Sequence, residues 1–283
     1  NKIYHAEMAG INIDGQYDLV SGNEIWGTSQ YPNRLGGIYS GCANRSGADA
    51  DAMRFFGQHH VISGNYMHDI AYGTIDNPGP HTDCFQTWGS SASTTDDVTF
   101  VGNLCRWPSA SNGEIGMIES RDGSVGALYF DDNVFANMLQ GLNVSDNSSM
   151  TIDFWNNTVD HILEEGVIFI NGGTSNDQVV NNIFYDVGNG GDSFLCDNGS
   201  VTVQANDQFM RSGSPGTYCS NATAENADPL FVNSGDSTCS GADYHLQSNS
   251  PCESVGVTLP DVTNDYDGVS RPSGSYSEGA YQK

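Results

Sequence analysis

The stretch PHTDCFQTWG, residues 80–89, places five side chains capable of chemistry within eight residues: His81, Asp83, Cys84, Gln86 and Trp88. A histidine can serve as a general base near neutral pH, and an aspartate as an acid, a base or a metal ligand. We take His81 and Asp83 as candidate catalytic residues, and Gln86 and Trp88 as candidate substrate-binding residues. Each also has a structural interpretation, because His81 can hydrogen-bond a turn and Trp88 can pack at a corner.

Carboxylates upstream of this stretch suggest a cation site. Asp49 and Asp51 lie two residues apart in GADADAM and share a face of an extended segment. We expect Asp83 on the neighbouring strand, about 4.8 Å away. Converging carboxylates repel unless one is protonated or a cation lies between them. Ca²⁺, which takes six to eight oxygen ligands, is therefore predicted at Asp49, Asp51 and Asp83. The alternative is that these aspartates cap turns through bonds to the backbone.

A repeat predicts the elements that position these residues. An alternating strand ending in asparagine and followed by an apolar pair recurs at Asn23, Asn65, Asn103, Asn133, Asn157 and Asn182. Between the copies lie second short strands, at 51–56, 83–88, 115–120, 140–145, 165–170 and 192–197. Strand repeats of 20 to 50 residues are typical of a solenoid. Asparagines stacked at one corner can hydrogen-bond one another, as in cross-β ladders. A β-sandwich with coincidental Asn-rich turns is the alternative.

The second strands can be aligned to predict which residues face outward. Their third positions are apolar and are expected inside: Met53, Phe85, Met117, Leu142, Val167 and Phe194. Their second positions are small: Ala52, Cys84, Gly116, Gly141, Gly166 and Ser193. Because alternate residues share a face, the second and fourth positions are expected to face outward. The small residues would then form the floor of a groove flanked by Arg54, Gln86 and Asn143, and Asn143 is a third candidate substrate-binding residue.

The repeat and the C-terminal landmarks DPLF, HLQ, SPC, RP and GAY resemble the right-handed parallel β-helix superfamily, the pectate-lyase-like solenoids. The resemblance covers almost the whole chain. It implies an all-β single domain, with β-helix coils over 1–223 that carry longer loops on the early rungs. A C-terminal capping segment of the same domain would follow over 224–283. Such solenoids bind extended polymers in grooves, but they include lyases, hydrolases, epimerases, adhesins and passive scaffolds.

Three mechanistic alternatives remain open. In a lyase, a base removes the proton next to a uronate carboxylate, whose charge Ca²⁺ or arginine neutralises. The resemblance implies lysine or arginine as the base, and both lysines lie at the chain ends, which leaves Arg54 or His81. In an inverting hydrolase, two of Asp51, Asp83 and Glu119 would flank the bond. The third alternative is a protein without catalysis.

Seven cysteines with no CxxC pair make a zinc ribbon improbable and favour disulfides in an oxidising, extracellular setting. Cys84 and Cys105 lie 21 residues apart, about one coil, and could form a disulfide. Two other pairs, Cys196 with Cys219 and Cys239 with Cys252, are spaced as local loop staples.

The charge excludes some partners. Asp and Glu number 35 against nine Lys and Arg, for a net charge of −26, which should repel nucleic acid and anionic membranes. No apolar run is long enough to insert into a membrane. No capping helix precedes the first strand of the repeat, so we expect further chain or another molecule at this end, with self-association as one possibility.

We therefore predict a secreted protein that binds and cleaves a polysaccharide, with lyase-type β-elimination on an acidic glycan ahead of inverting glycoside hydrolysis. The alternative is a non-catalytic structural or adhesive extracellular protein, a filament or surface-layer subunit in which β-helices stack end to end.

Overall fold

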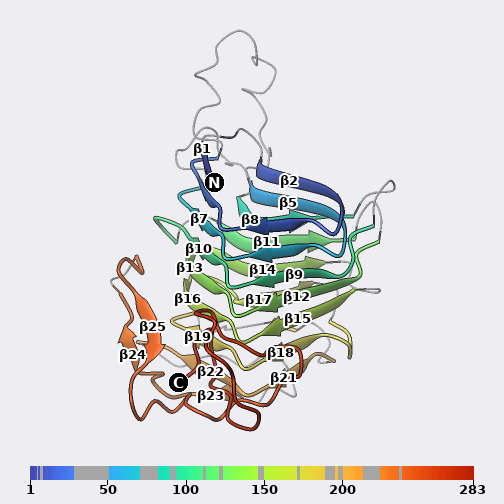
Figure 1. Ribbon diagram of the computed structural model, residues 1–283. Helices are drawn as coiled ribbons and strands as arrows, with labels where there is room; N and C mark the ends of the chain where they lie inside the picture. The colour runs from blue at the N-terminus through green and yellow to red at the C-terminus, as the bar shows by residue number, and fades with distance from the viewer. Residues whose placement is uncertain are drawn as a thin grey trace.

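The chain folds as a parallel β-helix (Figure 1). The computed structural model describes residues 1–4, 6, 9–28, 51–70, 82–89, 94–110, 113–120, 124–145, 150–170, 173–188, 195–196, 200–212, 224–235 and 238–283. Three long parallel sheets, here sheets A, B and C, run along the solenoid, and each rung contributes a strand to each sheet in the order B, C, A. The all-β solenoid predicted from the asparagine repeat is confirmed.

Sheet A has nine strands. In spatial order they are β1 (Lys2–Tyr4), β4 (Glu24–Trp26), β7 (Tyr66–His68), β10 (Leu104–Arg106), β13 (Val134–Met138), β16 (Thr158–Ile162), β19 (Ile183–Tyr185), β22 (Asn206–Phe209) and β23 (Ala224–Glu225).

Sheets B and C have seven strands each. Sheet B contains β2 (Ala9–Gln16), β5 (Asp51–Gln58), β8 (Asp83–Thr87), β11 (Glu114–Glu119), β14 (Gln140–Ser145), β17 (Val167–Ile170) and β20 (Leu195–Cys196). Sheet C contains β3 (Leu19–Ser21), β6 (Val61–Ser63), β9 (Val98–Val101), β12 (Ala127–Asp131), β15 (Thr151–Trp155), β18 (Gln178–Val180) and β21 (Thr202–Gln204).

Phenylalanines fill the interior of the solenoid. Phe100 and Phe130 stack on successive rungs with ring centroids 4.5 Å apart. Phe85 of sheet B packs against Phe100 at 4.6 Å and meets Phe135 of sheet A edge-on. All four side chains are completely buried, and each such burial stabilises the fold by roughly 1.5–3 kcal/mol. The alternation of inward apolar and outward polar residues along each strand produces this continuous core.

The predicted asparagine ladder is present where sheet C turns into sheet A. From Asn65 onward, each Asn Oδ1 accepts hydrogen bonds from the backbone N–H and the Nδ2 of the asparagine on the preceding rung, as Asn133 does from Asn103 at 2.9 Å each. The Nδ2 of Asn133 also donates to the Phe100 carbonyl. The ladder is longer than predicted, because Asn1 and Asn206 extend it at its two ends.

The C-terminal segment packs along the sides of the solenoid. An antiparallel pair, β24 (Phe231–Asn233) and β25 (Asp243–Leu246), begins it. Phe231 and Tyr244 join a cluster with Val134, Ile183 and Tyr185 on the outer face of sheet A. A second cluster covers the outer face of sheet C, formed by Trp155, Val180, Leu259, Val262 and Tyr276.

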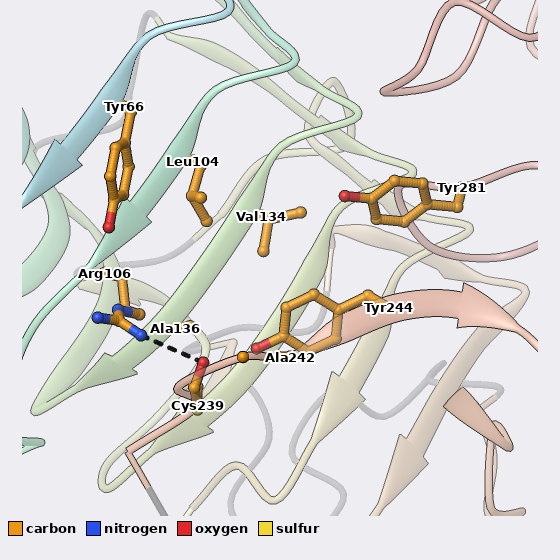
Figure 2. Close-up of a pocket in the computed structure, with 10 residues that line it drawn as sticks. Tyr66, Leu104, Arg106, Val134, Ala136, Cys239, Ala242, Tyr244 and Tyr281 are labelled. Atoms are coloured by element: carbon orange, nitrogen blue, oxygen red, sulfur yellow. Dashed lines mark hydrogen bonds between the residues drawn. The ribbon is translucent and has the colours of Figure 1, made fainter. Parts of the chain in front are cut away.

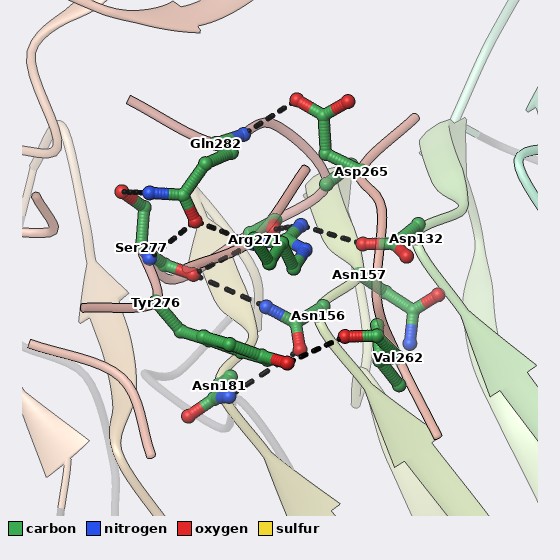
Figure 3. Close-up of polar contacts among 12 residues, drawn as sticks. Asp132, Asn156, Asn157, Asn181, Val262, Asp265, Arg271, Tyr276, Ser277 and Gln282 are labelled. Carbon is green, nitrogen blue, oxygen red and sulfur yellow. Dashed lines mark hydrogen bonds and ion pairs between the residues drawn. The ribbon is translucent and has the colours of Figure 1, made fainter. Parts of the chain in front are cut away.

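Arg271 anchors this segment (Figure 3). Its Nη2 lies 2.5 Å from Asp132 Oδ1 and 2.9 Å from the Gly279 carbonyl, and its Nη1 donates to the Ser277 carbonyl. Burial raises the pKa of Asp132 to about 7, although the Arg271 guanidinium acts in the opposite direction. The contact joins positions 139 residues apart in the chain.

The first rung leaves several apolar side chains accessible. Tyr4, Tyr17 and Leu19 are 59%, 73% and 69% exposed. Among the described strands, β1, β2 and β3 each pair on one side only. Self-association through this end stays a prediction. In the described part of the chain, no helix is long and apolar enough to cross a membrane.

One predicted disulfide is formed and one is not. Cys84 and Cys105 are joined, with an S–S distance of 2.03 Å. The predicted bond between Cys239 and Cys252 is wrong, because both are buried free thiols. Cys252 lies 3.5 Å from Asp207 of β22, whereas Cys239 lies near Asp160 of β16, and burial together with this carboxyl raises the pKa of its thiol.

The strands that carry these two carboxyls are two positions apart in sheet A, about 10 Å, so the two thiols lie beside different rungs. The predicted pairing of Cys196 with Cys219 lies outside the described residues, because the structure describes neither side chain.

Candidate functional site

The register of sheet B decides which candidate residues share a face. Arg54 pairs with Gln86, Gln86 with Met117, Met117 with Asn143, and Asn143 with Ile168. These five residues therefore form one row along the axis, here called the outer row. The expectation that Arg54, Gln86 and Asn143 lie on a common line is confirmed. Asn143 is the last of the three polar residues in the row, and Ile168 on β17 follows it.

The predicted alignment of β11 was wrong by one residue. Met117 lies in the outer row, and Gly116 occupies the inward position between Phe85 and Leu142. The completely buried apolar residues of β11 are Ile115 and Ile118, and not Met117 as predicted. A Cβ on Gly116 would lie 2.4 Å from the Phe85 carbonyl oxygen, so the inward site on this rung requires glycine. A shift of one residue exchanges the two faces of a strand, and the sequence alignment made this error.

The predicted floor of small residues is also wrong on the rungs of β5 and β8. Ala52 and Cys84 are completely buried and belong to the hydrophobic core cluster. The disulfide explains the position of Cys84, because its partner Cys105 lies in β10 among core residues. The second positions of β5 and β8 therefore contribute to the interior, and the outer row itself forms the candidate surface.

Three carboxylates stack at the start of sheet B. Asp51 opens β5, Asp83 opens β8 and Glu114 opens β11, and Glu114 pairs in register with Asp83. The backbone N–H of Asp83 donates to Asp51 Oδ1 at 3.3 Å. The three residues are 0%, 0% and 9% exposed. We call them the carboxylate column. On the next rung Gln140 replaces the acid.

Arg54 lies beside this column. Its Nε donates to Asp51 Oδ2 at 2.6 Å, and both residues are buried. The guanidinium carbon also lies 5.5 Å from the centre of the Trp88 ring. A carboxylate and an aromatic face are both favourable partners for a guanidinium. Arg54 is thus held in place at the N-terminal end of the outer row.

Trp88 is a packed but partly accessible residue. Its ring meets Phe56 edge-on with centroids 4.8 Å apart, while Arg54 lies over its face. The ring keeps an intermediate exposure. Gln86 is 4% exposed, and its Oε1 is buried without a hydrogen-bond partner. Among the described residues this oxygen therefore has an unused capacity to accept a hydrogen bond, and it lies next to Arg54 and Trp88.

Glu119 does not join the carboxylate column. It ends β11 and pairs with Ser145, whereas Glu114 begins the same strand. Five residues of extended chain separate the two positions by about 16 Å. The acid of the third rung closest to Asp83 is therefore Glu114, which the sequence alignment missed.

Two candidate residues fall outside the described chain. His81 and Asp49 are not among the described residues, so their places as a base and a calcium ligand stay predictions. Within the described ranges, no three His, Cys, Asp or Glu side chains are grouped so that they could hold a metal ion. The Ca²⁺ site expected at Asp49, Asp51 and Asp83 includes one residue beyond these ranges and stays a prediction as well.

Comparison with known proteins adds no family assignment. No protein-family model matches the chain, and no curated protein matches it significantly.

Proposed function

We propose that this chain binds a polysaccharide along the outer row of sheet B and cleaves it at the N-terminal rungs. The observation that carries the proposal is the carboxylate column, which is confined to β5, β8 and β11 and lies beside Arg54. Stacked carboxylates repel one another, so burying three of them on successive rungs is costly for a scaffold. Buried acids clustered with an arginine are typical of catalytic sites.

The fold supports a polymeric substrate. The outer row offers groups at a rung spacing of about 4.8 Å over at least five strands, which suits an extended chain of sugar units. The sequence resemblance to pectate-lyase-like solenoids points in the same direction. The disulfide between Cys84 and Cys105 supports an extracellular location, because such bonds persist in oxidising compartments.

Lyase-type β-elimination on an acidic glycan is the favoured reaction. In the proposed reaction the Arg54 guanidinium, which gives its Nε to Asp51, would also neutralise the carboxylate of a uronate unit. A guanidinium stays protonated in proteins, which makes Arg54 a poor base. We therefore assign proton abstraction to His81 and charge neutralisation to Arg54, with Ca²⁺ as a possible additional cation. Trp88 and Gln86 would position the sugar.

Inverting hydrolysis is the second candidate, because the two-rung separation within the carboxylate column is close to the distance that this reaction requires. Asp51 and Glu114 lie two rungs apart, about 9.6 Å between their backbones. Inverting glycosidases separate their two carboxyl groups by roughly 6.5–9.5 Å, which leaves room for the attacking water. In this reaction one acid of the column protonates the leaving oxygen and another activates the water.

A depolymerisation assay distinguishes the two reactions. The protein is incubated with uronate-containing and neutral polysaccharides, with Ca²⁺ and then with EDTA, while unsaturated products and new reducing ends are followed separately. We expect unsaturated products from a uronate polymer, and their loss with EDTA would establish a role for Ca²⁺. Reducing ends without unsaturation would identify the hydrolase. Neither product across a broad panel would contradict the proposed cleavage and favour the structural or adhesive alternative.

A further inference from the structure

We propose that a second ligand site, for a carboxylated sugar unit, lies on a different face of the molecule from the candidate catalytic surface. A cavity of about 170 Å³ opens between the outer face of sheet A and the C-terminal segment. Its walls include Tyr66, Leu104, Arg106, Val134, Tyr244 and Tyr281. Figure 2 shows Tyr66 and Arg106 on one side, Tyr244 and Tyr281 on the other, and Leu104 and Val134 between them.

Arg106 supplies the charge that selects the ligand. Its Nη1 makes one long hydrogen bond, 3.4 Å, to the Cys239 carbonyl, and its buried Nε has no partner. The other arginines that the structure describes are all ion-paired: Arg54 with Asp51, Arg211 with Asp160, and Arg271 with Asp132. Arg106 has no carboxylate within 4.0 Å among the described residues.

This isolation is informative because the chain carries a net charge of −26. With acids in nearly fourfold excess over bases, an arginine that faces a cavity and keeps away from every described carboxylate is available for an anion from outside. A guanidinium recognises a carboxylate through two parallel hydrogen bonds. The geometry therefore points to a carboxylate-bearing ligand.

The tyrosines supply the surface for a sugar ring. Tyr66 is held by stacking on His68, with centroids 4.3 Å apart, and Tyr281 by packing against Tyr266 at 5.1 Å. In the described chain neither the Tyr66 nor the Tyr281 hydroxyl makes a hydrogen bond, whereas the Tyr244 hydroxyl donates to Asp160. Two fixed rings with available hydroxyls offer both an apolar face and hydrogen-bonding groups, the combination that a sugar ring requires.

The size of the cavity limits the ligand to one unit. Sites for drug-sized molecules occupy roughly 300–1,000 Å³. A space of about 170 Å³ holds the equivalent of five or six water molecules, or a single sugar ring. The proposal is thus for the end of an acidic glycan or a free sugar acid. It goes beyond the proposed cleavage, because the site lies on sheet A and shares no residue with the outer row of sheet B.

Calorimetric titration tests the site. Glucuronate, galacturonate, glucose and inorganic phosphate are titrated into an Arg54→Ala protein, which removes the uronate partner on sheet B. We expect both uronates to bind at least tenfold more tightly than glucose. Adding Arg106→Gln should weaken uronate binding at least tenfold, and adding Ala242→Leu, which fills the cavity without changing charge, should weaken binding of the uronates to the same extent. Thermal unfolding confirms that each variant is folded.

Several outcomes would overturn this proposal. Uronate affinity that is unchanged by both Arg106→Gln and Ala242→Leu would place binding elsewhere. Equal affinity for glucose would show that the site does not recognise a carboxylate. Phosphate binding as tight as uronate binding would show that the site binds anions without recognising a sugar. Because Arg106→Gln in the otherwise native chain should leave depolymerisation unchanged, failure of this site and failure of the proposed cleavage are distinguishable.

Discussion

Two columns of polar side chains run along this solenoid, and they differ in composition and extent. The asparagine ladder passes from Asn1 to Asn206 through every rung between them. The carboxylate column at the start of sheet B occupies three rungs and then gives way to Gln140. An asparagine side chain both donates and accepts, so identical residues satisfy one another when stacked. An ionised carboxylate only accepts hydrogen bonds, so stacked carboxylates cannot satisfy one another in this way.

The difference separates scaffold from site. A neutral, self-complementary ladder is needed on every rung and is therefore continuous. A charged column needs partners of other types, which here include the Arg54 guanidinium and a backbone N–H. A feature limited to β5, β8 and β11 is not required by the fold, since β14 and β17 form the same sheet without it. We conclude that the ladder stabilises the protein, and we propose that the column serves its function.

The largest effect is expected from Arg54→Ala. Removing the cation beside the column should lower kcat/KM on a uronate polymer by about a thousandfold, or about 4 kcal/mol of transition-state stabilisation. Initial rates of unsaturated-product formation measure this. Arg211→Ala is the matched control, because Arg211 lies on the sheet A side with Asp160 and Asp186. Equal losses in both variants would deny Arg54 a specific role.

Asn133→Ala should act on the ladder alone. The side chain of Asn133 takes part in four hydrogen bonds, with Asn103, Phe100 and Asn157 as partners. At about 1 kcal/mol each, their loss should lower the free energy of unfolding by about 4 kcal/mol. Denaturant unfolding measures it, and Asn176→Ala, in an exposed turn, should cost less than about 0.5 kcal/mol. A small effect at Asn133 would contradict the structural role of the ladder.

Removal of the Cys84–Cys105 disulfide tests how much this bond stabilises the rung that carries both columns. The disulfide joins β8, which carries Asp83, to β10, which follows Asn103 of the ladder. Closing a loop of 21 residues stabilises a protein by about 3 kcal/mol. A Cys84→Ser/Cys105→Ser double variant should unfold at correspondingly lower denaturant. An unchanged midpoint would show that core packing alone fixes this rung.

The smallest effect is expected at a buried acid outside the column. Asp153 on sheet C is 5% exposed, and burial, with Asp177 and Asp261 nearby, raises its pKa to about 7. A group whose pKa is raised on folding contributes most below its unfolded value, and this stability is lost as the pH rises through 7. The melting temperature of the Asp153→Asn variant, minus that of the native chain, should therefore increase between pH 5 and pH 8. A gap that is constant with pH would show that Asp153 does not titrate in this range.

The ladder was predictable because each rung repeats the same local signal. A strand, an asparagine and an apolar pair identify Asn65 or Asn133 without any knowledge of distant contacts. Asn206 was missed because both residues that follow it, Asp207 and Gln208, are polar. The strands β1 and β2 were missed for a similar reason, since neither matches the pattern preserved in later rungs.

The column was only partly predictable. Asp51 and Asp83 were identified from their positions at the starts of strands, whereas Glu114 was lost through the shift in β11. That shift arose at Gly116. Its inward position is set by its pairing with Phe85 and Leu142, and a glycine gives no hydrophobic signal from which this position could be predicted. Arg106 carried no local signal, because its contact with Cys239 spans 133 residues.

The most direct test compares Asp83→Asn with Asn133→Ala in two measurements, the rate of polymer cleavage per folded molecule and the free energy of unfolding. The account predicts opposite results. Asp83→Asn, which keeps the size of the side chain, should lower the rate at least a hundredfold and leave unfolding close to that of the native chain. Asn133→Ala should destabilise the fold and keep the rate. Full cleavage by Asp83→Asn, or activity lost in proportion to stability in both variants, would contradict the assignment of the carboxylate column to function.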